Sequence, residues 1–145
     1  VQLAIANNPQ LDVSDWELRR ETISYTWHTA KHFASIHGDS LRILVGMDSL
    51  RDLHNWYKGQ ELAETYRFIV YKRPDSAPPN QSELANHFGA DTASRLLSAV
   101  VDGPAFAISS TEIRRSISTG KDASAHLPSA VTAYVTANQL YKESQ

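Results

Sequence analysis

Short apolar runs alternate along this chain with segments whose apolar residues have helical spacing. The run LRILV at residues 41–45 predicts a strand that is apolar on both faces and covered by helices on each side, as in parallel sheets. A second β-rich run begins near Phe68 and is closed by Pro74, and residues 98–104 (SAVVDGP) are a third candidate strand. A weaker alternation at residues 11–18 predicts one more strand, short and partly exposed.

Helical segments are expected between and after these strands. The helix that precedes residue 41 has aromatic and apolar residues at helical spacing, with Ser24 or Thr26 as its cap and Gly38 as its stop. Further helical segments are expected at residues 49–53, 60–65, 82–89, 91–97, 110–119 and 128–138.

This order of elements predicts an α/β fold with a parallel sheet, flanking helices and right-handed crossovers. A single domain is expected to span residues 1–145, since this length and 41% hydrophobic residues are ordinary for one globular domain. The stretch at residues 74–83 is rich in Pro, Ser and Asn and is predicted to be a mobile loop, either a lid or a plain connection.

Charge and composition exclude several classes of partner. With 14 basic and 16 acidic residues, the chain has no bulk field that would attract nucleic acid or a membrane surface, so any anion site must be local. The chain has no cysteine, which excludes disulfides and thiolate sites and is compatible with a cytoplasmic location. No apolar run approaches the length of a membrane span.

Gly46 and Asp48 follow the carboxyl end of a predicted strand, where open α/β sheets bind their ligands. A glycine lets a ligand approach the backbone, and an acid at this place can accept hydrogen bonds from ribose hydroxyls. The alternative is that Asp48 only caps the short helix that follows.

Trp56 and Tyr57 follow that short helix in a polar context. The aromatic pair could stack on a flat heteroaromatic ring beside backbone amides that hold a carboxylate. The alternative is that Trp56 is a half-buried surface residue.

The stretch ISSTEIRRSISTG, residues 108–120, contains a well-specified helix start. Ser109 and Glu112 stand three apart, as in a capping box, and Gly120 is placed to end the helix. Helix-start N–H groups, hydroxyls and an arginine one turn further on can bind a phosphate; the alternative is a plain capped helix with solvated arginines. The candidate phosphate ligands are Ser109, Ser110, Thr111 and Arg114.

Two other features are weaker candidates for chemistry. Arg73 ends the second strand and is expected to point toward the same crevice, unless it is a plain surface arginine. His28 and His32 stand four apart on one helix face, as zinc ligands do, but no third ligand stands at a matching position, so no metal site is predicted.

Six stretches in this order resemble bacterial nicotinate mononucleotide adenylyltransferases, from Val1 to Tyr141. The resemblance implies a Rossmann-like nucleotidyltransferase fold. It also implies transfer of AMP from ATP to nicotinate mononucleotide, giving deamido-NAD and pyrophosphate in NAD biosynthesis. The stretches are LAIANNP, SDWELRRETISYTWHTA, LVGMDSLRDLHNWYKGQEL, FIVYKRP, ISSTEIRRSISTG and LPSAVTAYVTANQLY.

The resemblance also implies roles for individual residues, with Mg²⁺ carried on the ATP polyphosphate. The adenylate ribose is expected at Gly46 and Asp48, and the ATP phosphates at Ser109, Ser110, Thr111 and Arg114. The nicotinate ring and carboxylate are expected at Thr26, Trp56 and Tyr57, and the mononucleotide phosphate at Arg73.

The chain departs from this family at one motif. The family's first strand-to-helix turn carries an H-x-G-H motif, which has no counterpart here. The first residues, VQLAIANNP, are typical of the last turns of a helix that Pro9 closes. We therefore expect the catalytic histidines and the N-terminal βαβ part upstream of Val1, and no catalytic residue in this chain. If one side of the sheet is left uncovered as a result, self-association is expected.

Two other functions remain open on the sequence alone. The chain could be a non-catalytic nucleotide-binding remnant of the same fold. It could also be a sibling adenylyltransferase that uses nicotinamide mononucleotide or phosphopantetheine. The expected partners are small-molecule substrates, and a homo-oligomer is compatible with the sequence.

Overall fold

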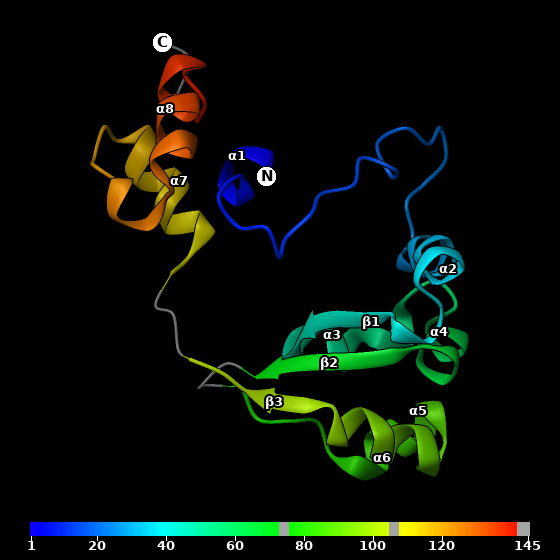
Figure 1. Cartoon of the computed structure of the whole chain (residues 1–145). Helices are drawn as coiled ribbons and strands as arrows, with labels where there is room; N and C mark the ends of the chain where they lie inside the picture. The colour runs from blue at the N-terminus through cyan, green and yellow to red at the C-terminus, as the bar shows by residue number, and fades with distance from the viewer. Residues whose placement is uncertain (73–75, 105–107, 142–145) are drawn as a thin grey trace. The chain divides into compact units, whose positions relative to one another are not determined.

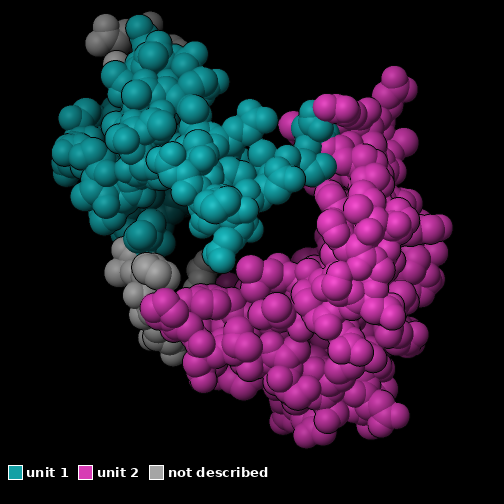
Figure 2. All heavy atoms as spheres, viewed as in Figure 1, with its two compact units in different colours: residues 1–15, 106–145 teal, residues 16–105 magenta. Residues whose placement is uncertain are grey.

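The computed structural model describes residues 1–72, 76–104 and 108–141. Two compact units make up the chain (Figure 2). One consists of residues 1–15 and 106–145, and the other of residues 16–105.

A three-stranded parallel sheet organises the unit of residues 16–105 (Figure 1). Its strands are β1 (Arg42–Gly46), β2 (Arg67–Lys72) and β3 (Val100–Asp102), with β2 in the centre. Val70 on β2 pairs with Val45 and Val100 on its two sides and is fully buried. The predicted α/β fold and the three strands expected between residues 41 and 104 are confirmed.

One face of this sheet forms the core together with the helices that connect the strands. Leu50 on α3, Leu62 on α4 and Val70 have no exposed surface. Burial of each such side chain stabilises the fold by about 1.5–3 kcal/mol. The helices of this unit are α2 (Thr26–His37), α3 (Met47–Asp52), α4 (Gly59–Thr65), α5 (Gln81–Phe88) and α6 (Ala90–Ser98), with 3-10 turns at Gly38–Ser40 and Leu53–Asn55.

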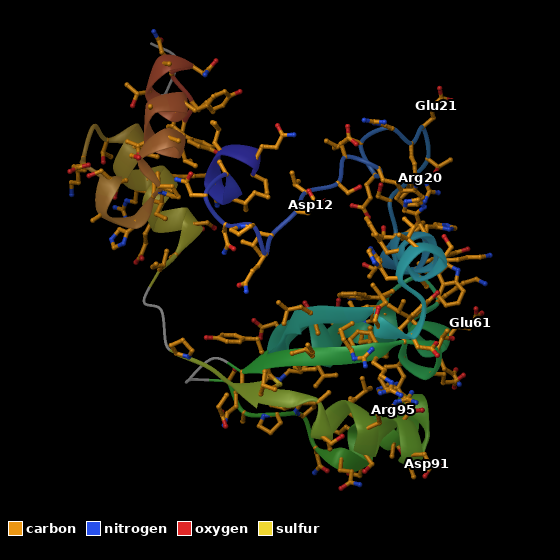
Figure 3. The ribbon with its side chains drawn as sticks, in the orientation of Figure 1. Asp12, Arg20, Glu21, Glu61, Asp91 and Arg95 are labelled. Carbon is orange, nitrogen blue, oxygen red and sulfur yellow. The ribbon has the colours of Figure 1, made fainter. Side chains whose placement is uncertain are left out.

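Arg95 on α6 joins α6 to the end of α4 (Figure 3). Its Nη2 donates hydrogen bonds to the carbonyl oxygens of Ala63 at 2.6 Å and Glu64 at 3.1 Å. The last carbonyls of a helix lack partners within the helix, so this guanidinium satisfies the C-terminal end of α4.

The other face of the sheet exposes apolar side chains. Leu44 is 69% exposed, its register partner Ile69 is 36% exposed, and Val101 is 43% exposed. Burial alternates along β1, with Arg42, Leu44 and Gly46 on the exposed side. Within the unit of residues 16–105, β1 is covered on one face only, which differs from the predicted cover on both faces, because cover depends on neighbouring elements and not on the strand's own composition.

We expect the 145-residue chain to self-associate through this exposed face, because adjacent apolar side chains on a sheet favour burial against another surface. Leu44→Thr should raise the monomer fraction measured by light scattering. Ile36→Thr, which changes an exposed isoleucine on α2, is the matched control and should have little effect. A monodisperse monomer of the unchanged chain would contradict the expectation.

The strand predicted at residues 11–18 is absent, and this prediction was wrong. Residues 11–15 have no regular structure and residues 16–19 form a turn. Leu11 and Leu18 are both exposed. A strand needs a hydrogen-bonded neighbour, and the described sheet consists of β1, β2 and β3 alone.

The ends of two helices also differ from the predictions. Tyr25 is the N-cap of α2 and makes no side-chain cap bond, so neither Ser24 nor Thr26 has the predicted role, whereas Gly38 ends the helix with a φ of 57° as predicted. The predicted loop at 74–83 is shorter, because α5 begins at Gln81; Asn80 caps it by accepting a hydrogen bond from Ser82 N at 2.9 Å. Residues 73–75 lie outside the described residues.

The second unit is helical in its described part. It contains α1 (Gln2–Ile5), α7 (Ser110–Ser118), a 3-10 turn at Ser124–His126 and α8 (Ser129–Ala137). Gly120, with a φ of 73°, ends α7: its N–H binds Ile117 O at 3.1 Å, and Lys121 N binds Ser116 O at 2.8 Å. The predicted helix at 110–119 and its glycine stop are confirmed. Among residues 1–72, 76–104 and 108–141, no helix combines the length and apolarity that a membrane crossing requires.

Candidate functional site

The carboxyl end of β1 is open around Gly46. This glycine is the N-cap of α3, with extended φ and ψ of −82° and 168°. A Cβ built on Gly46 would meet no atom within 4 Å. A ligand therefore has room to approach the backbone at the point where the strand passes into the helix.

Asp48 presents its carboxylate to solvent in the first turn of α3. Its side chain is 82% exposed, and Arg51 Nη1 lies 3.3 Å from its Oδ1. The N-cap of α3 is Gly46 and receives no side-chain bond, so Asp48 does not cap the helix by a hydrogen bond, although an acid in the first turn stabilises the helix end. The carboxylate keeps acceptor positions that a pair of hydroxyls could use.

A cavity of about 270 Å³ lies between two segments that are about thirty residues apart in the sequence. One segment leads into α2, and the other joins the turn Leu53–Asn55 to α4. Gly59 allows the second segment to pack closely, because a Cβ there would overlap the carbonyl oxygen of Leu53. The lining residues are Ser24, Tyr25, Thr26, Asn55, Trp56 and Tyr57.

Aromatic rings form one wall of this cavity. Tyr57 stacks on Tyr25 with ring centroids 4.4 Å apart and on His28 at 5.7 Å. Trp56 is half-buried, packs against the hydrophobic core and also lines the cavity. Trp56 is therefore a half-buried residue, as the second interpretation states, and its place in the cavity lining leaves a stacking role as a prediction.

The start of α2 supplies backbone donors at the same cavity. His28 N donates a hydrogen bond to Tyr25 O at 2.9 Å, and it is the first amide of α2 that is bonded to a preceding carbonyl. The N–H groups of Thr26 and Trp27 precede it, at the end of the helix that favours negative charge. The arrangement suits a planar ring that carries an acidic group.

The N-terminus of α7, in the other unit, holds the candidate phosphate ligands together. Ser109 Oγ accepts a hydrogen bond from Glu112 N at 3.4 Å, which is one half of the predicted capping box. Arg114 Nη2 donates to Thr111 Oγ1 at 3.3 Å, and Ser110 is the first residue of the helix. The side of α7 that carries Thr111 and Arg114 combines hydroxyls, a cation and helix-start amides.

A second cavity, of about 250 Å³, lies on another side of α7 and is lined by Ser109, Glu112 and Asp122 among others. Two hydrogen bonds from Ser124 lower the pKa of the Asp122 carboxyl group. The backbone N–H has the larger effect and the hydroxyl the smaller one. Two carboxylates make this cavity unsuited to a phosphate. An anion site at this helix would therefore lie on the side of Thr111 and Arg114, whereas the Ser109 side chain faces the cavity with the carboxylates and accepts the cap bond from Glu112 N.

Comparison with known proteins identifies the family. The sequence profile of the cytidylyltransferase-like family matches residues 1–116. A protein of Serratia proteamaculans named "Probable nicotinate-nucleotide adenylyltransferase" is 36% identical, in a match that covers 98% of this chain and 70% of the relative. The chain belongs to the nicotinate-nucleotide adenylyltransferase family.

Further matches agree with this membership. A Caldicellulosiruptor bescii protein of the same name is 30% identical over 98% of this chain. The solved structure of Plasmodium falciparum nicotinic acid mononucleotide adenylyltransferase complexed with NaAD shares the fold, with a TM-score of 0.60, 19% identity and coverage of 83% of this chain. The chain spans 70% of the length of these two bacterial relatives and 58% of the Plasmodium chain.

The candidate residues of this adenylyltransferase-family chain divide between its two units. Gly46, Asp48 and the cavity at residues 24–26 and 55–57 belong to the unit of residues 16–105. The α7 residues belong to the other unit. Arg73 lies outside the described residues.

The two histidines with metal-ligand spacing have aromatic neighbours. His32 stacks on Trp16 with centroids 4.2 Å apart, and His28 stacks on Tyr57. No group of three His, Asp or Glu side chains among the described residues is arranged to hold a metal ion.

Four residues of the site escaped the sequence-based reasoning. Ser24, Tyr25 and Asn55 line the cavity, and Arg51 contacts Asp48. Tyr25 precedes Thr26 and Asn55 precedes Trp56. Their position next to a predicted site residue was the signal that could have indicated them. The contact of Arg51 followed from its position three residues after Asp48 on a helix.

Proposed function

We propose that this chain acts in the adenylylation of nicotinate mononucleotide. The AMP group of ATP is transferred to the phosphate of nicotinate mononucleotide, and the products are deamido-NAD and pyrophosphate. The observation that carries the proposal is the aromatic cavity beside the start of α2, in a chain of the nicotinate-nucleotide adenylyltransferase family. A cytoplasmic location is part of this proposal, because both substrates are small soluble nucleotides.

The cavity at residues 24–26 and 55–57 would hold the pyridine ring. The indole of Trp56 would stack on the ring, with Tyr57 completing the wall. Backbone amides near Thr26 and Tyr57 would donate hydrogen bonds to the nicotinate carboxylate. A carboxylate is a stronger acceptor than a carboxamide, so this arrangement favours the acid over the amide.

The ATP would be held by the remaining candidates. Gly46 would admit the adenylate close to the backbone, and Asp48 would accept hydrogen bonds from the ribose hydroxyls. Arg73 would contact the mononucleotide phosphate. The α7 residues would bind ATP phosphates, and these are Ser109, Ser110, Thr111 and Arg114.

The chemistry needs no protein nucleophile. A phosphate oxygen of nicotinate mononucleotide attacks the α-phosphorus of ATP, a new P–O bond forms, and the bond to the bridging oxygen breaks to release pyrophosphate. Catalysis of such a step consists mainly of alignment and charge neutralisation. Mg²⁺ would enter with ATP on its phosphates and would offset their negative charge.

The direct test is pyrophosphate release by the complete gene product supplied with Mg·ATP and nicotinate mononucleotide. Release is expected with nicotinate mononucleotide and is expected to be much slower with nicotinamide mononucleotide or phosphopantetheine. No release above background with any of the three acceptors would contradict the proposal.

A second candidate is a nucleotide-binding protein of the same fold without catalysis. The family's H-x-G-H motif has no counterpart in these 145 residues. Calorimetry separates the two functions: heat of ATP binding without any pyrophosphate release from the complete gene product would indicate the non-catalytic protein.

A further inference from the structure

Arg51, on the last turn of α3, has two partners for one guanidinium group. Its Nη1 lies 3.3 Å from Asp48 Oδ1, and its Nη2 donates a hydrogen bond to the carbonyl oxygen of Ala77. The two acceptors are thus joined by a single planar group. Lysine could not reproduce this contact, because an ammonium lacks the rigid fork of donors.

The second partner lies in a segment that is distant in sequence. Ala77 is 26 residues from Arg51 and belongs to the irregular segment 76–80, which lies between β2 and α5. The first partner, Asp48, follows the carboxyl end of β1. Arg51 therefore connects the chain that leaves β1 with the chain that leaves β2.

We propose that Arg51 is a positioning residue for Asp48 and at the same time the tether of segment 76–80. The inference rests on the proposed function, in which Asp48 accepts hydrogen bonds from the ribose of ATP. An ionised carboxylate has two oxygens with about four acceptor positions, so a single contact to Oδ1 leaves the others for a pair of hydroxyls. Arg51 holds the exposed Asp48 side chain in the orientation in which it accepts the hydrogen bonds of the ribose hydroxyls. Less conformational entropy is then lost when ATP binds.

The ion pair also affects the charge near the nucleotide. An unpaired Asp48 would repel the polyphosphate of ATP, whereas the Asp48–Arg51 pair is neutral as a whole. Arg51 is 44% exposed, so the gain in fold stability from the pair is small. Its effect is expected in ligand recognition.

The decisive experiment compares ATP with 2′-deoxy-ATP, measured as Kd by calorimetry on the complete gene product. The unchanged protein should prefer ATP, because a hydroxyl that pairs with Asp48 is absent from 2′-deoxy-ATP. Arg51→Gln should reduce this preference about three- to tenfold, which is less than the roughly tenfold or larger effect of losing a hydrogen bond to a charged group, because the Asp48 carboxylate remains in place. In an Asp48→Asn background, Arg51→Gln should leave the preference unchanged, because the carboxylate through which it acts is gone.

An equal loss of affinity for ATP and 2′-deoxy-ATP in Arg51→Gln would overturn the positioning role. The positioning role would also be overturned if Arg51→Gln reduced the preference for ATP over 2′-deoxy-ATP equally in the unchanged protein and in the Asp48→Asn background. Arg42→Gln is the matched control. Arg42 also donates to backbone carbonyls, those of Asp39 at 2.6 Å and Leu41 at 2.8 Å, but at the amino end of β1, and its substitution should not alter the preference.

The tether is tested independently of nucleotide binding. The chain has no cysteine, so Ala77→Cys gives a single site for a nitroxide label at an exposed position whose carbonyl remains in place. Arg51→Gln and Arg51→Lys should both increase the mobility of the label, and Arg42→Gln should not. Unchanged spectra for both Arg51 variants would overturn the tether.

The two readouts distinguish this inference from the proposed function. If the unchanged protein does not bind ATP, the proposed function fails, and the positioning role fails with it. If ATP binds and only the Arg51 results differ from expectation, the proposed function stands and the inference alone is overturned.

Discussion

Trp56→Ala is expected to raise the Kd for nicotinate mononucleotide about ten- to a hundredfold and to leave the Kd for ATP nearly unchanged. Loss of an aromatic ring that stacks on a base costs about 1–3 kcal/mol per base, which corresponds to this range. Trp56 lines the cavity beside the start of α2, whereas Gly46 and Asp48 lie at the start of α3. Calorimetric titration with each nucleotide separately measures the two effects.

Controls are needed because Trp56 also packs against the hydrophobic core. Trp56→Phe keeps an aromatic wall and should retain most of the affinity. Tyr66→Ala removes a partly buried aromatic residue that packs on the same core but does not line the cavity, so it should reduce stability and spare the affinity. Equal losses for both nucleotides in Trp56→Ala would indicate a general disturbance of the fold and would contradict a pyridine-stacking role.

Gly59→Ala is expected to lower the free energy of unfolding by about 2–4 kcal/mol, at the upper end of overpacking effects. The added Cβ would overlap the carbonyl oxygen of Leu53 and would lie 3.6 Å from Trp56 Cβ. The backbone has little freedom to move aside, because Leu53 and Leu62 are buried in the core and Gly59 N binds Trp56 O at 2.8 Å. Urea unfolding should show a lower midpoint with the slope unchanged.

Gly46→Ala is the matched control for Gly59→Ala. The chemical change is the same, but the Cβ at Gly46 would meet open space, and the backbone φ of −82° accepts any L-residue. Its unfolding midpoint should remain close to that of the unchanged chain. If the two alanine variants have equal midpoints, the close packing of α4 against the Leu53–Asn55 turn is not what stabilises this region.

Several elements could be predicted because their causes are local. The glycines at positions 38 and 120 end their helices with positive φ, and Ser109 starts α7 with its own hydroxyl. These features depend on the chemistry of a few neighbouring residues, which a sequence displays directly. The three parallel strands were predictable for a similar reason, since each is a compact β-rich run with helices around it.

Other predictions failed where the outcome depended on distant segments. Residues 11–18 have a weak alternation, yet no described strand pairs with them. Leu44 belongs to a run that resembles a fully covered strand, but within the unit of residues 16–105 it is exposed, because the helices of that unit pack on the other face. Alternation and hydrophobicity describe what a segment could bury, and they do not state whether a partner is present.

The sequence by itself determined the order of the elements, the helix ends at Gly38 and Gly120, and the membership of the family through its stretches of similar residues. Only the tertiary structure decided that residues 24–26 meet residues 55–57 around one cavity, and that Arg51 joins Asp48 to Ala77. The reason is physical. Helix ends follow from torsion angles and hydrogen bonds within a few residues, whereas a cavity or a tether requires segments 26 to 30 residues apart to be packed against a common core.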